Sequence, residues 1–346
     1  MFARFWLWIT VTVLAATFAP VLEAQEKIPT PAPPPTMKEP DLPPPPDAKI
    51  IAAKVNGQTI QELAVFRGLL REDPKKWTTV RKDVLNYLID NMLVDQYLTQ
   101  LKIAVEAKEI DERVTQIKAE AKKSGMEFDV LLKRLFLSEE DLRRELTGAL
   151  RWDKFVLQQG NEKVLKEMFD KNKNMFDGSQ VQARHILLPA PAQEQPQVQA
   201  KLAALRKQIE AQVAAEMTKL PPTTDSLTRE KERMKYLDKA FSEAAMKEST
   251  CPSKAEGGNL GFFPRVGAMV EPFARTAFAL KPYQMSDPVL TEFGYHLILT
   301  VDVKPGREVK YEDVKPFVQE VYGERLREAI ITSYKPRSKI EIFAAK

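Results

Sequence analysis

The sequence STCPSKAEGGNLGFF at residues 249–263, followed by FGYHLIL at residues 293–299, decides the fold of the second half of the chain. The glycines at 257, 258 and 261 indicate a tight passage of the backbone, because glycine accepts positive φ angles and close neighbours. Between the two pieces, apolar residues recur at helical spacing over residues 266–280, which predicts a helix. The second piece continues to residue 301 as an apolar run with several β-branched side chains, which predicts a strand.

The chain has two histidines, and both fall on predicted strands on either side of the glycine-rich loop. His296 lies in the strand just described, and His185 lies in the strand-like run 180–188. Cys251, the only cysteine, precedes the glycines, so no internal disulfide can form. One cysteine and two histidines cannot supply the four soft ligands of a structural zinc site, and we expect neither a metal nor a cofactor.

Several motifs follow one another in order in this region: ARHIL at 183–187, GGNLGF at 257–262, PF at 272–273 with AFAL at 277–280, SDPV at 286–289 and FGYH at 293–296. Together they make the region resemble the parvulin family of peptidyl-prolyl cis-trans isomerases, also called rotamases. The resemblance implies a parvulin domain over residues 180–305, built as a small antiparallel sheet wrapped by helices. It also implies an enzyme that rotates X–Pro bonds by non-covalent catalysis.

The resemblance further implies a central polar cluster of His185, Cys251 and His296. Without it, a histidine on a strand would be interpreted as a core residue, and a lone cysteine as an inert apolar one. A nucleophilic Cys–His pair is the other reading. We disfavour it because no hydrolase signature surrounds Cys251.

The implied substrate-binding residues are Leu260, Met269, Phe273 and Phe293. A flexible Met and a flat Phe suit the pyrrolidine ring of proline. Core packing of the helix 266–280 is the alternative role for Met269 and Phe273. The sequence departs from the family pattern at three places: Phe293 replaces a frequent hydroxyl, Val270 replaces a frequent glutamine, and the spacing from Gly261 to Met269 is one residue longer.

The N-terminal residues predict export from the cytoplasm. Residues 1–24 resemble a signal peptide, with Arg4 before an uncharged, largely apolar run at 5–19. That run is short for a spanning helix, which needs about 20 residues. We expect a periplasmic or other extracytoplasmic location, with membrane attachment only if the signal is not cleaved. Residues 25–47 are rich in proline and predict a disordered linker.

Residues 48–179 together with 308–346 predict a mainly helical domain that holds the parvulin domain as an insertion, which gives an α+β fold. Its run of helices resembles the chaperone domain of secreted foldases of the SurA and PrsA type, and a generic helical domain is the alternative. The resemblance implies that the strand-like residues 339–343 pair near residues 50–55. Within the parvulin part, residues 217–236 are predicted to be an insertion.

Two functions fit these features. The first is a prolyl isomerase that acts as a foldase and chaperone on exported, unfolded proteins; the alternative is a polypeptide-binding chaperone with a catalytically weak parvulin domain. Both imply extended, proline-containing polypeptides as partners. A net charge of +4 from interspersed charges argues against nucleic acid. The glycines lack the Gly-x-Gly-x-x-Gly order of a nucleotide site.

Overall fold

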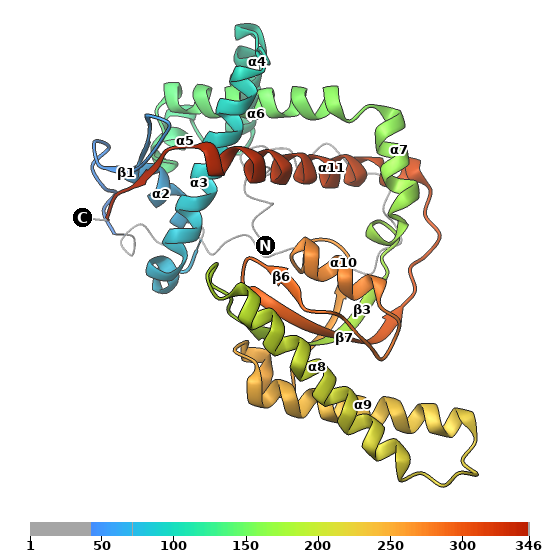
Figure 1. The fold of residues 1–346 in the computed structure, drawn as a ribbon. Helices are drawn as coiled ribbons and strands as arrows, with labels where there is room; N and C mark the ends of the chain where they lie inside the picture. The colour runs from blue at the N-terminus through green and yellow to red at the C-terminus, as the bar shows by residue number, and fades with distance from the viewer. Residues whose placement is uncertain (1–42, 71, 345–346) are drawn as a thin grey trace. The chain divides into compact units, whose positions relative to one another are not determined.

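The computed structural model describes residues 43–70 and 72–344. The predicted signal peptide and most of the predicted linker therefore lie outside the described residues. The chain divides into two compact units (Figure 1). We call residues 166–318 the inserted unit, and residues 43–165 with 319–344 the flanking unit. No helix in the described part of the chain is both long and apolar enough to cross a membrane.

The flanking unit contains a three-stranded sheet in the order β2-β1-β8. Strand β1 (Ile51–Val55) turns through Asn56 and Gly57, both with positive φ, into β2 (Gln58–Gln61). Strand β8 (Ile340–Ile342) pairs antiparallel with β1, with Ala53 opposite Ile342. The prediction that the C-terminal strand pairs near residues 50–55 is therefore confirmed.

Helices make up the rest of the flanking unit. They are α2 (Glu62–Leu69), η2 (Pro74–Lys76), α3 (Trp77–Gln100), α4 (Ala107–Lys123), α5 (Phe128–Arg134), α6 (Glu139–Gln159), part of α11 (Tyr311–Tyr334) and η5 (Lys335–Arg337). Helix α6 begins at a capping box, where the Asp141 N–H donates to Ser138 Oγ at 3.0 Å and the Ser138 N–H donates to Asp141 Oδ2 at 3.2 Å. The apolar face of α3 packs on β1 in one core cluster.

The inserted unit is built on an antiparallel sheet in the order β4-β3-β7-β5, with β6 also paired to β7. Its strands are β3 (Gln180–Leu188), β4 (Asn259–Pro264), β5 (Gln284–Met285), β6 (Val289–Thr291) and β7 (Gly294–Lys304). Its helices are most of α7 (Glu162–Lys171), η3 (Lys173–Met175), α8 (Gln195–Thr218), α9 (Ser226–Glu248), η4 (Pro252–Glu256), α10 (Glu271–Ala279) and the start of α11. The predicted α+β class is confirmed.

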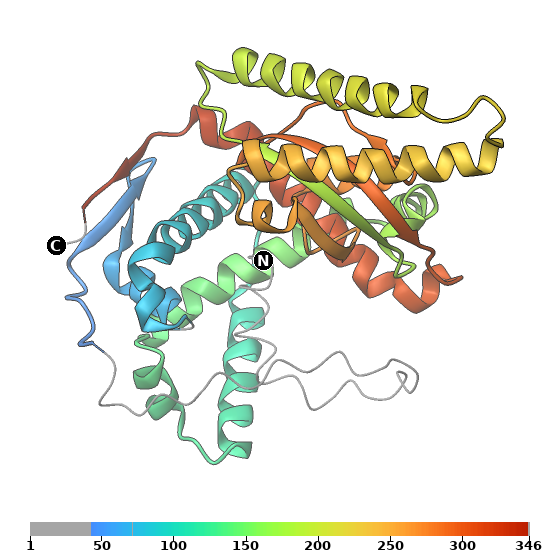
Figure 2. The same cartoon turned by 90° about the horizontal axis from the view of Figure 1, so that it is seen from below.

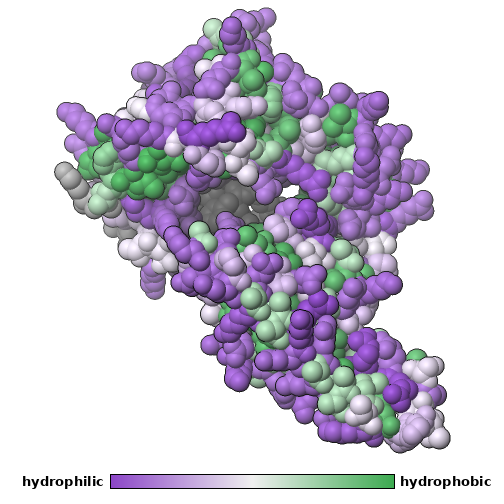
Figure 3. All heavy atoms as spheres, viewed as in Figure 1, coloured by the Kyte–Doolittle hydropathy of each residue, from purple (hydrophilic) through white to green (hydrophobic). Residues whose placement is uncertain are grey.

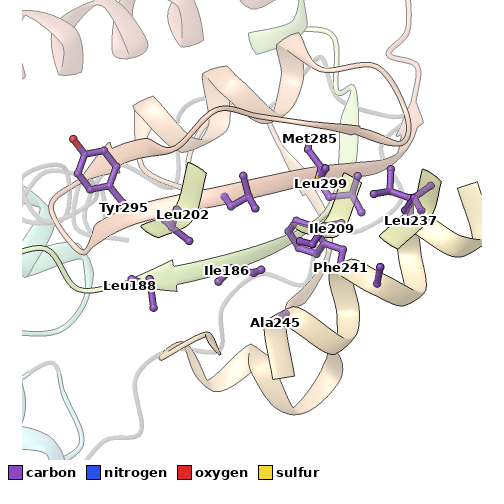
Figure 4. Close-up of a cluster of buried hydrophobic side chains, with 13 residues drawn as sticks. Ile186, Leu188, Leu202, Ile209, Leu237, Phe241, Ala245, Met285, Tyr295 and Leu299 are labelled. Atoms are coloured by element: carbon purple, nitrogen blue, oxygen red, sulfur yellow. The ribbon is translucent and has the colours of Figure 1, made fainter. Parts of the chain in front are cut away.

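Two cores form on opposite faces of this sheet, because successive strand residues point to opposite sides. Leu297 and Leu299 of β7 pack with α8 and α9. Figure 4 shows Leu299 in this cluster. Ile298 of the same strand packs with Phe273 and Ala277 of α10. The sheet is therefore buried on both sides, which explains why the consecutive residues Leu297, Ile298 and Leu299 of β7 are all apolar.

The segment 217–236 is helical over most of its length. Helix α8 continues to Thr218, and α9 begins at Ser226, where Asp225 Oδ1 accepts from the Thr228 N–H at 2.9 Å. The residues predicted as an insertion therefore lengthen a helical hairpin, which Figures 1 and 2 show extending past the sheet. Because Asp225 caps α9, this helix begins inside the segment and continues to Glu248.

Candidate active site

The two histidines lie on the same face of the sheet. The register of β3 and β7 places His185 opposite Ile298, and Leu187 opposite His296. Because side chains alternate along a strand, the two imidazoles become diagonal neighbours on the face that α10 covers. Both side chains are buried, with 4% of their surface exposed.

The imidazoles form a direct hydrogen bond, with 3.1 Å between His185 Nδ1 and His296 Nδ1. Their rings are nearly parallel, at 18°. Each outer nitrogen meets a hydroxyl: Ser253 Oγ lies 3.0 Å from His185 Nε2, and Thr291 Oγ1 lies 2.8 Å from His296 Nε2. The result is a chain of four hydrogen-bonding groups in which every ring nitrogen has a partner.

The hydroxyls determine how protons are arranged along this chain. Thr291 Oγ1 accepts from the Phe293 N–H at 3.1 Å and donates to the Gly294 carbonyl at 3.3 Å. These contacts favour a His296 Nε2–H that donates to Thr291. His296 Nδ1 then accepts from His185 Nδ1–H, and His185 Nε2 accepts from the Ser253 hydroxyl. Each ring is neutral in this arrangement.

Burial also favours the neutral rings. Desolvation lowers the pKa of His185 from 6.5 to about 4. Desolvation and then the charge of His185 lower the pKa of His296 to about 4. Both imidazoles are therefore uncharged at neutral pH, and the site offers polarity without a net charge.

Phe273 packs against both imidazoles. Its ring lies edge-on to both imidazoles, with centroid distances of 5.6 Å to His185 and 5.2 Å to His296. Only 2% of Phe273 is exposed, whereas Leu260 and Met269 of the same cluster are half-buried. Phe293, at the β6–β7 turn, is 58% exposed. A ligand can therefore reach Leu260, Met269 and Phe293, with Phe273 beneath the imidazoles.

Cys251 does not join the hydrogen-bonded chain. Among the described residues, no hydrogen bond reaches its sulfur, and its backbone N–H donates to Ser249 Oγ at 3.3 Å. The position next to His185 that a Cys–His pair would need is taken by Ser253, two residues further along. The sequence reasoning missed Ser253 and Thr291. Only one indication of their role was present in the sequence, which was that they lie in loops next to the motifs. That indication is weak, because serine and threonine are also typical of ordinary turns.

The loop that carries Ser253 is fixed by Arg184 and Gly258. Arg184 pairs with Asp238 of α9 through two bonds, of 2.8 and 3.1 Å, and donates to the carbonyls of Glu256 and Gly257. The His185 N–H donates to the Gly258 carbonyl at 2.9 Å. A Cβ on Gly258 would lie 2.3 Å from the His185 carbonyl oxygen, so only glycine permits this approach.

No group of three or more potential metal ligands occurs among residues 43–70 and 72–344. A cavity of about 410 Å³ lies in the flanking unit, lined by polar residues such as Asn56, Gln96 and Gln100. Their amides bond to neighbouring groups, including Asn56 Nδ2 to Gln96 Oε1 and Gln100 Nε2 to the Tyr334 hydroxyl. This cavity contains none of the predicted site residues, and its network joins β1, α3 and α11.

Comparison with protein families matches residues 220–302 to the rotamase family, the PPIC-type PPIase domain. The match includes Cys251 and His296, but it begins after β3 and therefore leaves out His185. The pairing of β3 with β7 is what places His185 at the same site. The chain is 28% identical over 276 residues to a Campylobacter jejuni protein named as the peptidyl-prolyl cis-trans isomerase Cbf2, covering 77% of this chain and 81% of that protein.

Two further relatives extend along most of the chain. The foldase protein PrsA of Clostridium botulinum is 25% identical over 331 residues, which cover 86% of this chain and 89% of that protein. A crystal structure of the peptidylprolyl isomerase PrsA from Bacillus anthracis is 22% identical, covers 75% of this chain and 100% of that chain, and has a TM-score of 0.41. At that TM-score the structural likeness adds nothing to the sequence matches.

Proposed function

We propose that the chain is a foldase of the parvulin-type peptidyl-prolyl cis-trans isomerase family, and that it rotates X–Pro bonds of exported, unfolded polypeptides at the site around His185 and His296. The observation that carries the site assignment is the neutral, fully bonded imidazole pair in contact with Phe273, whose core cluster also includes the half-buried side chains of Leu260 and Met269. The names of the similar proteins support the proposed reaction, and the geometry supports the proposed location of the active site.

Rotation about an X–Pro bond needs no covalent step, but it must overcome a barrier of about 18–20 kcal/mol that arises from amide resonance. The planar amide has charge separated between its oxygen and nitrogen, and the twisted amide has lost most of it. An apolar, water-poor surface therefore favours the twisted form over either planar form. Leu260 and Phe293 would provide that surface beside the amide, and Met269 would contact the proline ring, which is the same in the planar and twisted forms. Catalysis would follow from the preferential binding of the twisted amide.

The two hydrogen-bonded imidazoles would form a rigid polar surface next to the twisting amide. Neither ring offers a free nitrogen as a base, because both Nδ1 atoms bond to each other and both Nε2 atoms meet hydroxyls. The thiol of Cys251 has no imidazole bonded to it that could remove its proton. Both features support non-covalent catalysis over a nucleophilic cysteine.

Exposed apolar side chains support a role in holding unfolded polypeptides. In the flanking unit, Ile342 and Phe343 are 58% and 41% exposed at the strand that pairs with β1. Figure 3 shows several hydrophobic areas on this face of the molecule, one of which lies near β1. The predicted signal peptide supports an extracytoplasmic location for these clients.

The test is the cis-to-trans relaxation of a proline tetrapeptide with and without the full chain. We expect the protein to accelerate relaxation. His296→Ala should lower kcat/KM by about tenfold or more, because it removes one of the two imidazoles. Phe241→Leu is the matched control, because Phe241 is fully buried in the core on the other sheet face. A wild-type chain that binds the peptide without accelerating relaxation would instead be the chaperone with a weak parvulin domain.

A further inference from the structure

The loop between β4 and α10, residues 265–270, carries Met269 and has little regular structure to hold it. The sequence predicted a helix from residue 266, but α10 begins at Glu271, so Met269 lies on the loop. Gly267 has a φ of +89°, which bends the loop. No backbone hydrogen bond joins residues 266–269 to the other described residues. The position of Met269 must therefore be set by side chains.

An ion pair between a buried arginine and a half-buried glutamate closes this loop. Arg265 follows the last residue of β4, and only 4% of its side chain is exposed. Its Nη1 donates to Glu271 Oε2, and its Nη2 donates to Glu271 Oε1, each at 2.7 Å. This two-bond geometry fixes the planes of both groups, which a lysine at position 265 could not do.

The pair joins the two elements that form the site. Arg265 extends from the end of β4, which carries Leu260, and Glu271 is the first residue of α10, which carries Phe273. The carboxylate at the start of α10 also complements the partial positive charge of the helix N-terminus. Breaking the pair would leave a buried guanidinium uncompensated, so the loop ends are held firmly at this separation.

We propose that the Arg265–Glu271 pair is a positioning element that holds Met269 against the proline ring of the substrate. The proposal rests on the proposed function, because it assigns the pair to the same pocket. It also accounts for the loop length: the spacing from Gly261 to Met269 is one residue longer than is common in the family, and a longer loop samples more conformations unless its ends are fixed.

The first experiment observes Met269 directly. Methyl-labelled methionine in the full chain gives a resonance for each methionine, and Met269→Leu identifies that of Met269. Arg265→Lys should shift and broaden the Met269 signal and leave that of Met285, in the core on the other sheet face, unchanged. The matched control is Arg233→Lys, because Arg233 also makes a two-bond contact with a glutamate, Glu230 on the surface of α9, through Nε at 2.8 Å and Nη2 at 2.7 Å. An unmoved Met269 signal in Arg265→Lys overturns the proposal.

The second experiment measures kinetics. Arg265→Lys should raise KM for a proline tetrapeptide by about fivefold and change kcat by less than about twofold, because the pocket loosens while the imidazole pair stays intact. Glu271→Gln should have the same effect, and the double variant should be no worse than either single one, since both remove one interaction. A fall in kcat alone, or additive effects, would overturn the proposal.

The same peptide separates this proposal from the proposed function. If the wild-type chain binds the peptide but does not accelerate its relaxation, the catalytic assignment fails, and the dissociation constants of the same variants still test the pair. A fivefold weaker complex for Arg265→Lys, with Arg233→Lys unchanged, would then support the positioning role. Equal dissociation constants for all variants would refute it.

Discussion

Acidification provides the sharpest test of the imidazole pair. Burial lowers the pKa of His185 and of His296 from 6.5 to about 4. The folded chain therefore resists protonation in a pH range where the unfolded chain accepts it. The free energy of unfolding is therefore highest above pH 6.5, where both rings are neutral in the folded and the unfolded chain. It decreases as the pH falls from 6.5, the unfolded pKa, through the folded pKa of about 4.

The size of the effect follows from proton linkage. One pKa unit corresponds to about 1.4 kcal/mol, so a shift from 6.5 to about 4 corresponds to about 3.4 kcal/mol for one ring. At pH 5 the loss relative to pH 8 is about 2 kcal/mol for one ring and about 4 kcal/mol for both. An inserted unit of ordinary stability would lose a large part of its free energy of unfolding.

Nuclear magnetic resonance of selectively labelled histidine measures this directly. The chain has only two histidines, so the labelled full chain gives two imidazole signals. Both should titrate with midpoints near pH 4, and in urea-unfolded protein both should titrate near the ordinary value of about 6.5. The same signals, followed through a urea series at pH 8 and pH 5, give the change in the free energy of unfolding of the inserted unit. The isomerase activity should be independent of pH between these values while the unit stays folded.

A folded-state midpoint near 6.5 for either ring would refute the reasoning. It would mean that the ring is hydrated, and that the Nδ1–Nδ1 hydrogen bond does not exclude water. A free energy of unfolding that is equal at pH 8 and pH 5 would contradict it independently, because linkage requires the two measurements to agree.

Four further predictions follow from single contacts. Thr291→Val should lower kcat/KM by about tenfold, because it leaves His296 Nε2 buried without a partner at a cost of about 2 kcal/mol; relaxation kinetics measure it, and an unchanged rate argues against the hydroxyl. Gly258→Ala should destabilise the inserted unit by about 3 kcal/mol in urea unfolding, since its Cβ would meet the His185 carbonyl, and unaltered stability would show that the loop can move. Cys251→Ser should change kcat/KM by less than about threefold, whereas complete inactivation, with a trapped covalent adduct, would favour a nucleophile. Deleting residues 308–346 should abolish cooperative unfolding seen by Trp152, which packs with Leu326 and Ile330 of α11; a retained cooperative transition would contradict this.

The sequence identified the features of the site that depend on local pattern. Apolar runs predicted the strands of His185 and His296, and the paired glycines predicted the close backbone approach that Gly258 makes. The pairing of the C-terminal strand with β1 was also foreseen, although only through resemblance to foldases. These features were accessible because strand alternation and glycine stereochemistry act within a few residues.

The tertiary structure decided which side chains meet. Ser253, rather than Cys251, bonds to His185. The turn of η4 and the hydrogen bonds from Arg184 hold the loop in the position that brings Ser253 to the imidazole. These contacts come from residues that are far apart in the sequence. Met269 lies on a loop rather than a helix because α10 begins only at Glu271, after an extended Val270 and with Pro272 in the first turn, a position that proline favours. Side-chain period fixes the face on which a residue lies, but only packing between distant elements fixes its partner.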